Sequence, residues 1–295
     1  MKRKHIIPLL KNLLSEFTDD NCFVLSAALS YYTAFSIAPI LVMMIPIVSM
    51  FISPQEIQVQ LTEVMGEASA EMIATIMKNA SLGTNGGVVA TIISVVMVFI
   101  GSTTVFSVLN NSLNQIWQVK ADFDNDYVGF VWQRIKSFLM LFLCGLLLLL
   151  SVVANMVIHL LLVRFSEILN VSSAIFPFLN QIASLFISII LFTLVFKILS
   201  DAVIKWKYAF IGGICTAILF SVGKTLIGVY LANSNLGLVY GAAGSFAVLL
   251  TWLYYSSAIL FLGAEIIKVY MVHRGDDIKA SENAYRVDIV KQDEE

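Results

Sequence analysis

The sequence predicts an all-α membrane protein: a polytopic bundle of six transmembrane helices, with a kinked first helix and short amphipathic helices between the first two spans. Of its 295 residues, 59% are hydrophobic and 13% are charged, and the mean hydropathy is +0.87. Such a chain has too little polar surface to cover a soluble globule. No charged residue stands between Asp20 and Glu56, and long uncharged runs recur further along the chain, which indicates membrane spans.

The first span lies in the uncharged interval between Asp20 and Glu56 and contains two prolines. A straight helix over the whole interval would exceed the hydrocarbon core, which is about 30 Å thick. Pro39 and Pro46 each lack an amide hydrogen, and their spacing of nearly two turns opens both kinks on about the same side. We expect that side to face other helices or a wet cavity. The alternatives are a kinked helix packed in the bundle and a broken helix that lines a pathway.

Amphipathic segments are predicted on both sides of the first span. Residues 1–25 combine basic residues with apolar residues at rough helical period, which is typical of a helix on the membrane surface. After the span, Ser53-Pro54-Gln55-Glu56 has the order of a capping box with proline at the first helical position. Apolar residues then recur on one helical face, so residues 53–87 are predicted to form a helical cap outside the cytoplasm.

Five further apolar segments are long enough to span a membrane. The second span, at residues 88–109, has a polar stripe at its inner end, formed by Thr103, Ser107, Asn110 and Asn114 at helical spacing. A polar stripe on a membrane helix faces protein or water. The remaining spans are predicted at residues 138–161, 178–196, 209–231 and 243–267.

The basic residues predict the orientation of the spans. Of the 18 Lys and Arg residues, 15 lie in segments on the side of both termini, whereas Lys78 and Arg164 lie on the other side and Lys224 lies inside the fifth span. The positive-inside rule therefore places both termini in the cytoplasm. Residues 26–270 form the predicted membrane domain, and the polar residues 271–295 are predicted to be a frayed cytoplasmic tail.

Polar side chains inside the spans are the candidate substrate-binding residues. Lys224 shares its helical stripe with small residues from Gly213 to Gly228, which favours a face covered by another helix. A lysine on a covered face needs an anionic partner, for which we favour a group of the ligand; the alternative is that the lysine stem snorkels to the membrane surface. The other candidates are Ser30, Tyr31, Thr103, Ser107, Asn110, Asn155, His159 and Glu265.

Several candidates also have a purely structural interpretation. His159 follows Asn155 by one turn and can hydrogen-bond across helices, and Glu265 can pair with Lys268 at the end of the sixth span. Gly241 and Gly244 open that span, where small residues permit close packing or a flexible gate. The candidate hinges are Pro39, Pro46, Gly241 and Gly244.

No catalytic or metal centre is predicted. Asp122, Asp124 and Asp126 resemble the start of an EF-hand loop, but Tyr127 stands where glycine is needed and Gln133 where glutamate is needed. The three histidines are scattered, and the three cysteines have no paired spacing. We therefore expect no enzymatic activity, no cofactor, no metal and no nucleic-acid partner.

Several short motifs together resemble the YihY/BrkB family of bacterial inner-membrane proteins. They are Ala27-Ala28-Leu29-Ser30-Tyr31-Tyr32-Thr33 followed by Pro39, Asn114-Gln115-Ile116-Trp117, Lys205-Trp206-Lys207-Tyr208, Tyr240-Gly241-Ala242-Ala243-Gly244-Ser245, Trp252-Leu253-Tyr254-Tyr255 and Gly263-Ala264-Glu265. The resemblance covers residues 20–270. It implies a six-span protein of the bacterial cell envelope, in a family once labelled ribonuclease BN that lacks a settled activity.

The leading functional hypothesis is a transporter-like protein of the bacterial inner membrane that acts on a lipid or amphiphilic cell-envelope precursor. The polar stripes and the kinked first helix motivate it, and the expected partners are membrane lipids, with an anionic lipid or amphiphile as ligand. The alternative is a non-transporting membrane scaffold for envelope-assembly partners, with the cap at residues 53–87 as a docking surface. Ribonuclease activity is disfavoured because the residues assemble no metal-binding or acid-base cluster.

Overall fold

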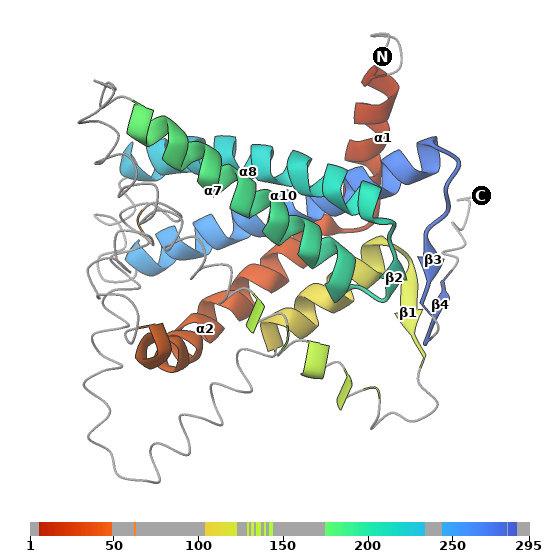
Figure 1. Cartoon of the computed structure of the whole chain (residues 1–295), viewed down its shortest axis with the longest axis horizontal. Helices are drawn as coiled ribbons and strands as arrows, with labels where there is room; N and C mark the ends of the chain where they lie inside the picture. The colour runs from red at the N-terminus through yellow and green to blue at the C-terminus, as the bar shows by residue number, and fades with distance from the viewer. Residues whose placement is uncertain are drawn as a thin grey trace, which may run out of the picture.

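The computed structural model describes residues 6–48, 62, 104–122, 129, 131–132, 134–136, 139, 142–143, 175–233, 244–281 and 283–287. Most of the described chain is helical (Figure 1). The helices are α1 (Ile6–Asp19), α2 (Cys22–Val48), α7 (Ile175–Leu194), the π-helical turn η3 (Val195–Leu199), α8 (Trp206–Asn233) and α10 (Gly244–His273), together with a helix over residues 104–116. The strands are β1 (Val119–Ala121), β2 (Ala202–Val203), β3 (Lys279–Ala280) and β4 (Ala284–Arg286).

Three of the described helical segments are long and apolar enough to cross a membrane. They run over Gln181–Leu199, Trp206–Ile227 and Phe246–His273, and Cys22–Ile37 of α2 is a shorter apolar helix. The helices predicted at residues 178–196, 209–231 and 243–267 are thereby confirmed. The helix at Trp206 begins three residues earlier than predicted, and the helix that ends at His273 runs six residues longer.

The first predicted span is an α-helix that begins at Cys22 and continues through the positions of Pro39 and Pro46 to Val48. The predicted kinks stay a prediction. Of the predicted cap, only Thr62 is described, and it is helical. Thr103, Asn155, His159 and Gly241, together with most of the third span, lie outside the described residues.

Helix α8 packs between α7 and α10, and two adjacent glycines permit this arrangement. A Cβ atom added at Gly213 would lie 2.2 Å from Thr193 Oγ1 and 3.0 Å from the Ile189 carbonyl oxygen on α7. One added at Gly212 would lie 2.4 Å from Ile267 on α10. Small residues at such positions bring membrane helices into close backbone contact. The first part of the stripe of small residues predicted on this span, at Gly213 and Ala217, therefore faces another helix, whereas Thr225 of the same stripe is exposed.

The described core has two apolar clusters. The larger contains Leu113, Ile116, Trp117, Phe196 and Phe261 near the ends of the helices, and the smaller contains Ala34, Val248, Leu249, Trp252 and Leu253. The Trp252 ring lies edge-on to Phe220 of α8, with 6.0 Å between centroids. Trp252 is therefore a core aromatic residue, one of the two roles that its place inside the span predicted.

Helix α1 crosses the end of the bundle, at a steep angle to α8 and α10 in Figure 1. Asn21 adopts a left-handed backbone conformation (φ 56°) and separates α1 from α2. Phe17 is buried against the bundle while Leu14 is 66% exposed. Helix α1 thus has one apolar side chain packed on the bundle and another that is exposed, and its place on the membrane surface stays a prediction.

The prediction of a frayed tail at residues 271–295 is wrong for its middle part. Strand β3 pairs with β2 and β4 pairs with β1, both antiparallel. The Ser281 amide donates to the Asp201 carbonyl at 2.9 Å, and the Val287 amide donates to the Gln118 carbonyl at 2.8 Å. The loops that follow two of the predicted spans present open strand edges, and a polar segment pairs with such edges through its backbone whatever its hydropathy.

Candidate functional site

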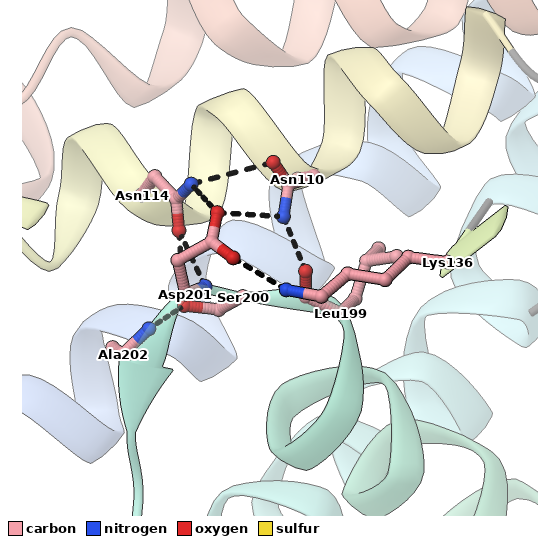
Figure 2. Close-up of polar contacts among 7 residues, drawn as sticks. All are labelled: Asn110, Asn114, Lys136, Leu199, Ser200, Asp201 and Ala202. Atoms are coloured by element: carbon pink, nitrogen blue, oxygen red, sulfur yellow. Dashed lines mark hydrogen bonds and ion pairs between the residues drawn. The ribbon is translucent and has the colours of Figure 1, made fainter. Parts of the chain in front are cut away.

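The polar stripe of the second span ends in a buried network around Asp201 (Figure 2). The Asn114 amide nitrogen donates to Asp201 Oδ2 at 2.7 Å. Its oxygen accepts from the Asp201 amide at 2.9 Å and from the Ser200 hydroxyl at 3.1 Å. Asn110 donates to the Leu199 carbonyl, and Lys136 forms an ion pair with Asp201.

This network holds the loop between η3 and β2 against the helix over residues 104–116. The inner end of the stripe therefore faces protein, one of the two environments predicted for it, and the Asn110 amide has a structural role. The Asp201 carboxylate, which is expensive to bury alone, has both an ammonium and amide donors as partners. Ser107, another member of the stripe, is half-buried.

A second buried cluster joins α1, α2 and α10. Lys268 Nζ lies 2.7 Å from Glu16 Oε2 and 3.6 Å from Glu265 Oε2, and it also pairs with Asp20. The Cys22 thiol donates to Glu265 Oε1 at 3.6 Å. The ion pair predicted between Glu265 and Lys268 is thus present, as one part of a larger cluster.

Glu265 is fully buried among the described residues, a place that suits a structural role. Carboxylate oxygens of Glu16, Asp20 and Glu265 lie within 4.8 Å of one another, which makes them the candidate ligands of a metal ion among the described residues. The Lys268 ammonium already pairs with all three, so a metal ion would have to compete with it.

The motif at residues 114–117 connects the two clusters. The Gln115 side chain donates to the Asp20 carbonyl at 3.4 Å, and Trp117 Nε1 donates to the Ala264 carbonyl at 3.1 Å. The Trp117 ring also packs against Phe196 of η3, with 6.3 Å between centroids. One short segment therefore contacts the junction between α1 and α2, helix α10 and the turn η3.

Lys224 belongs to a different place, a small polar cavity of about 50 Å³ between α7 and α8. Gln181, Ser184 and Ser188 of α7 and Ser221 of α8 supply its other polar side chains. The Gln181 side chain donates to the Ser221 hydroxyl at 3.3 Å. We call these five residues the polar seam. Ala217, one turn before Ser221, is fully buried, whereas Lys224 is half-buried.

The predicted site residues do not assemble into one site. About 27 Å of helix separates Trp206, at the end of the bundle that holds Glu265, from Lys224, at about 1.5 Å per residue. Ser30 is buried and donates to the Ala27 carbonyl of its own helix at 2.8 Å, while Tyr31 is 55% exposed and packs on Phe35. Gly244 is the first residue of α10.

The sequence did not single out Asp201, Lys136, Asp20 or Gln181 as site residues. Asp201 is the one acid in a loop with three lysines, and such a charge pattern usually marks a solvated loop. Gln181 and Ser184 are separated by one helical turn on an apolar helix, and that signal could have identified the seam. The partners of Asp20 and Asp201 lie too far away in the sequence to be recognised.

Comparison with known proteins identifies the relatives of the chain. A family described as "Virulence factor BrkB" matches residues 13–287. A UPF0761 membrane protein of Alcanivorax borkumensis is 24% identical over 266 residues, which is 88% of this chain and 59% of the relative. One of Pseudomonas aeruginosa is 25% identical over 262 residues, covering 86% and 61%. One of Coxiella burnetii is 25% identical over 269 residues, covering 88% and 92%.

The chain thus spans about three fifths of the length of the first two relatives. No solved structure matches it.

Proposed function

Since this chain belongs to the family described as Virulence factor BrkB, we propose that it is a transporter-like membrane protein that binds an anionic lipid or amphiphile at the polar seam. Its relatives are named as membrane proteins, and three described segments have the length and composition of spans. We therefore interpret the seam as part of an integral, multi-pass membrane protein. The family name and the names of the relatives do not state a substrate.

The polar seam is the observation that carries this proposal. It gathers five polar side chains on the facing sides of two apolar helices, where the surrounding hydrocarbon offers no hydrogen bonds. Polar groups in that setting are costly unless protein, water or a ligand satisfies them. An ionisable residue inside a span is a functional candidate for the same reason. The seam therefore suits a ligand that carries its own polar group into the membrane.

The charge and size of the seam indicate the ligand class. Lys224 contributes an ammonium group to the lining, and an ammonium group favours an anionic one. A cavity of about 50 Å³ accommodates a small polar group and not a whole lipid. We infer that a phosphate or carboxylate enters the seam while the apolar part of the ligand stays between the helices and the bilayer.

We further propose that the protein lies in the bacterial inner membrane with both termini in the cytoplasm. The ends of α7 and α10 and the beginnings of α2 and α8 lie at one end of the bundle, where the short strands are (Figure 1). Lys136, Lys197, Lys205 and Lys207 belong to this end as well. A concentration of lysine at one end supports a cytoplasmic assignment for it. Lys224 then lies in the outer half of the membrane.

Substitution of Lys224 tests the function. We expect Lys224→Met to insert and fold normally yet to fail to complement the envelope phenotype of a strain that lacks the gene, whereas Lys224→Arg retains part of the activity because it keeps the charge. Lys120→Met removes an exposed lysine of β1 and is the matched control. In proteoliposomes, the Met variant should also lose transbilayer movement of a fluorescent anionic lipid.

Full complementation by Lys224→Met at normal expression would refute the proposal and leave Lys224 as a snorkelling lysine. Loss of function in the Lys120→Met control to the same extent would show that the assay reports total charge and not the seam.

A further inference from the structure

A wide apolar groove lies on the surface between the end of α7 and the start of α8. Its volume is about 450 Å³, and it is lined by Ile190, Thr193, Leu194, Trp206, Lys207 and Phe210. Trp206 and Phe210 are 58% and 50% exposed. Two large aromatic side chains that remain open to the surroundings, next to aliphatic neighbours, favour an apolar occupant.

The groove lies at the boundary of the predicted hydrocarbon core. One candidate span ends at Leu199 and the next begins at Trp206, so the lining residues belong to the last turns of one span and the first turns of the other. Tryptophan at the first position of a span is typical of the layer where acyl chains meet headgroups. A ligand in the groove would have its apolar part in the core and its polar part at the lysines.

One lysine lines the groove, and two others lie next to its lining residues. Lys207 lines it, and Lys197 Nζ lies 5.7 Å from the centroid of the Trp206 ring. Lys205 and Lys207 share one acid, Asp276, at 2.7 and 3.5 Å. Lys197 donates to the Ile204 carbonyl at 2.6 Å, a neutral group. One carboxylate against three ammonium groups leaves an excess of positive charge at the mouth of an apolar groove.

We propose that this groove binds an acyl chain of an anionic phospholipid, with the lipid phosphate held by Lys207 and Lys197. A basic pocket between membrane helices at the headgroup layer recognises an anionic headgroup in this way. A zwitterionic lipid offers the same acyl chain without net charge and binds more weakly. The proposal requires that α7 and α8 span a membrane, and it does not depend on transport at the polar seam.

Quenching of tryptophan fluorescence tests the site directly, because brominated acyl chains quench the rings that they contact. The full chain is reconstituted in phosphatidylcholine vesicles that contain a small fraction of brominated phosphatidylglycerol or, separately, brominated phosphatidylcholine. We expect stronger quenching by the brominated phosphatidylglycerol, and we expect this excess to disappear in Trp206→Phe. That variant is needed because the chain has four tryptophans.

The lysines are tested in the same vesicles. Lys207→Gln should lower the relative affinity for phosphatidylglycerol about fivefold, which is the effect of one lysine near an anionic membrane surface. Lys120→Gln makes the same charge change at an exposed lysine outside the groove and should leave the affinity unchanged. Glycerol phosphate in solution should not compete, because it lacks the acyl chain.

Three results would overturn the proposal: equal quenching by the two brominated lipids, an excess that persists in Trp206→Phe, or an equal loss in Lys207→Gln and Lys120→Gln. Competition by glycerol phosphate would likewise refute a lipid site in favour of a site for free phosphate. Circular dichroism and the melting temperature confirm that each variant is folded before its affinity is compared.

Discussion

Asn114 uses both ends of its amide in contacts with one loop. Its nitrogen donates to the Asp201 side chain, and its oxygen accepts from the Asp201 amide and the Ser200 hydroxyl. Aspartate could not donate in the first contact, and leucine could make none of the three. A single asparagine thereby fixes the position of a buried carboxylate and of the loop that carries it.

We predict that Asn114→Ala destabilises the protein by roughly 2–4 kcal/mol, because it leaves a buried carboxylate and a buried amide short of partners. Denaturant unfolding in detergent micelles measures the free energy. Asn12→Ala, the same change at an exposed position of α1, is the control and should change it by less than about 0.5 kcal/mol. Equal losses in both variants would contradict the role of the network.

Asp276 is the titratable residue that fastens the segment after α10 to the start of α8. Hydrogen bonds from Lys205 and Tyr208 hold the pKa of Asp276 well below its usual range. Because the folded pKa is depressed, this contact stabilises the docked segment above the ordinary aspartate pKa of about 4 and is lost progressively as the pH falls below it.

We therefore expect a spin label at position 283 to become more mobile as the pH falls below about 4, the ordinary aspartate pKa. Asp276→Asn should raise the mobility at neutral pH and remove most of the pH dependence. Electron paramagnetic resonance of a cysteine-free protein carrying Asn283→Cys gives the measurement. A pH profile that is unchanged by Asp276→Asn would assign the transition to another group.

At the scale of elements, α8 is the helix that two neighbours approach most closely, through Gly212 and Gly213. The obstacles differ among the glycines of this helix. At Gly213 an added methyl group would meet backbone atoms of α7 at 3.0 Å, whereas at Gly223 it would meet the end of the Tyr255 side chain. A side-chain end can move aside, but a packed helix backbone cannot do so cheaply.

We predict that Gly213→Ala destabilises the bundle by about 1–3 kcal/mol, the usual cost of overpacking. Gly223→Ala makes the same change in the same helix and should cost less than Gly213→Ala, because the Tyr255 hydroxyl that the methyl group would meet at 1.6 Å belongs to a side chain that can rotate, whereas the α7 backbone cannot move. Melting temperatures in detergent compare the two variants. A larger loss in Gly223→Ala would mean that the contact between α8 and α10 and not that with α7 limits the packing.

At the scale of the whole molecule, the orientation in the membrane is a prediction of the charge pattern. In an otherwise cysteine-free chain, single cysteines near Asn79 and near Ser234 should react with an impermeant thiol reagent added outside sealed cells, and one at Asp124 should not. Disruption of the membrane should make the Asp124 site reactive and serves as the control. Labelling of that site in sealed cells would reverse the orientation.

The helices at the end of the chain were predictable because length and apolar composition are signals that are local in the sequence. The inward-facing stripe at Asn110 and Asn114 and the covered stripe at Gly213 and Ala217 were predictable for the same reason, from helical spacing. Their partners were not. Asp201 lies 87 residues from Asn114, and Lys268 lies 248 residues from Asp20, so nothing in either neighbourhood identifies the other.

The tail shows a further limit of prediction from the sequence. Residues 279–287 are polar and mixed in charge, which is the composition of a disordered segment. Their order depends on the edges of β1 and β2, and these edges exist only once the helices around them have packed. The packing of the helices therefore determines whether this segment is ordered, because its own sequence favours no regular structure.

The pairing of the tail with two earlier loops also sets an order for biogenesis. The ribosome makes β3 and β4 only after α10. Strands β1 and β2 therefore remain unpaired while the described helices reach the membrane. Insertion of the helices and pairing of the strands at this end are then separate events, and the strands pair last. A released chain truncated after His273 would contain every described helix, yet it would lack the strands that pair with β1 and β2.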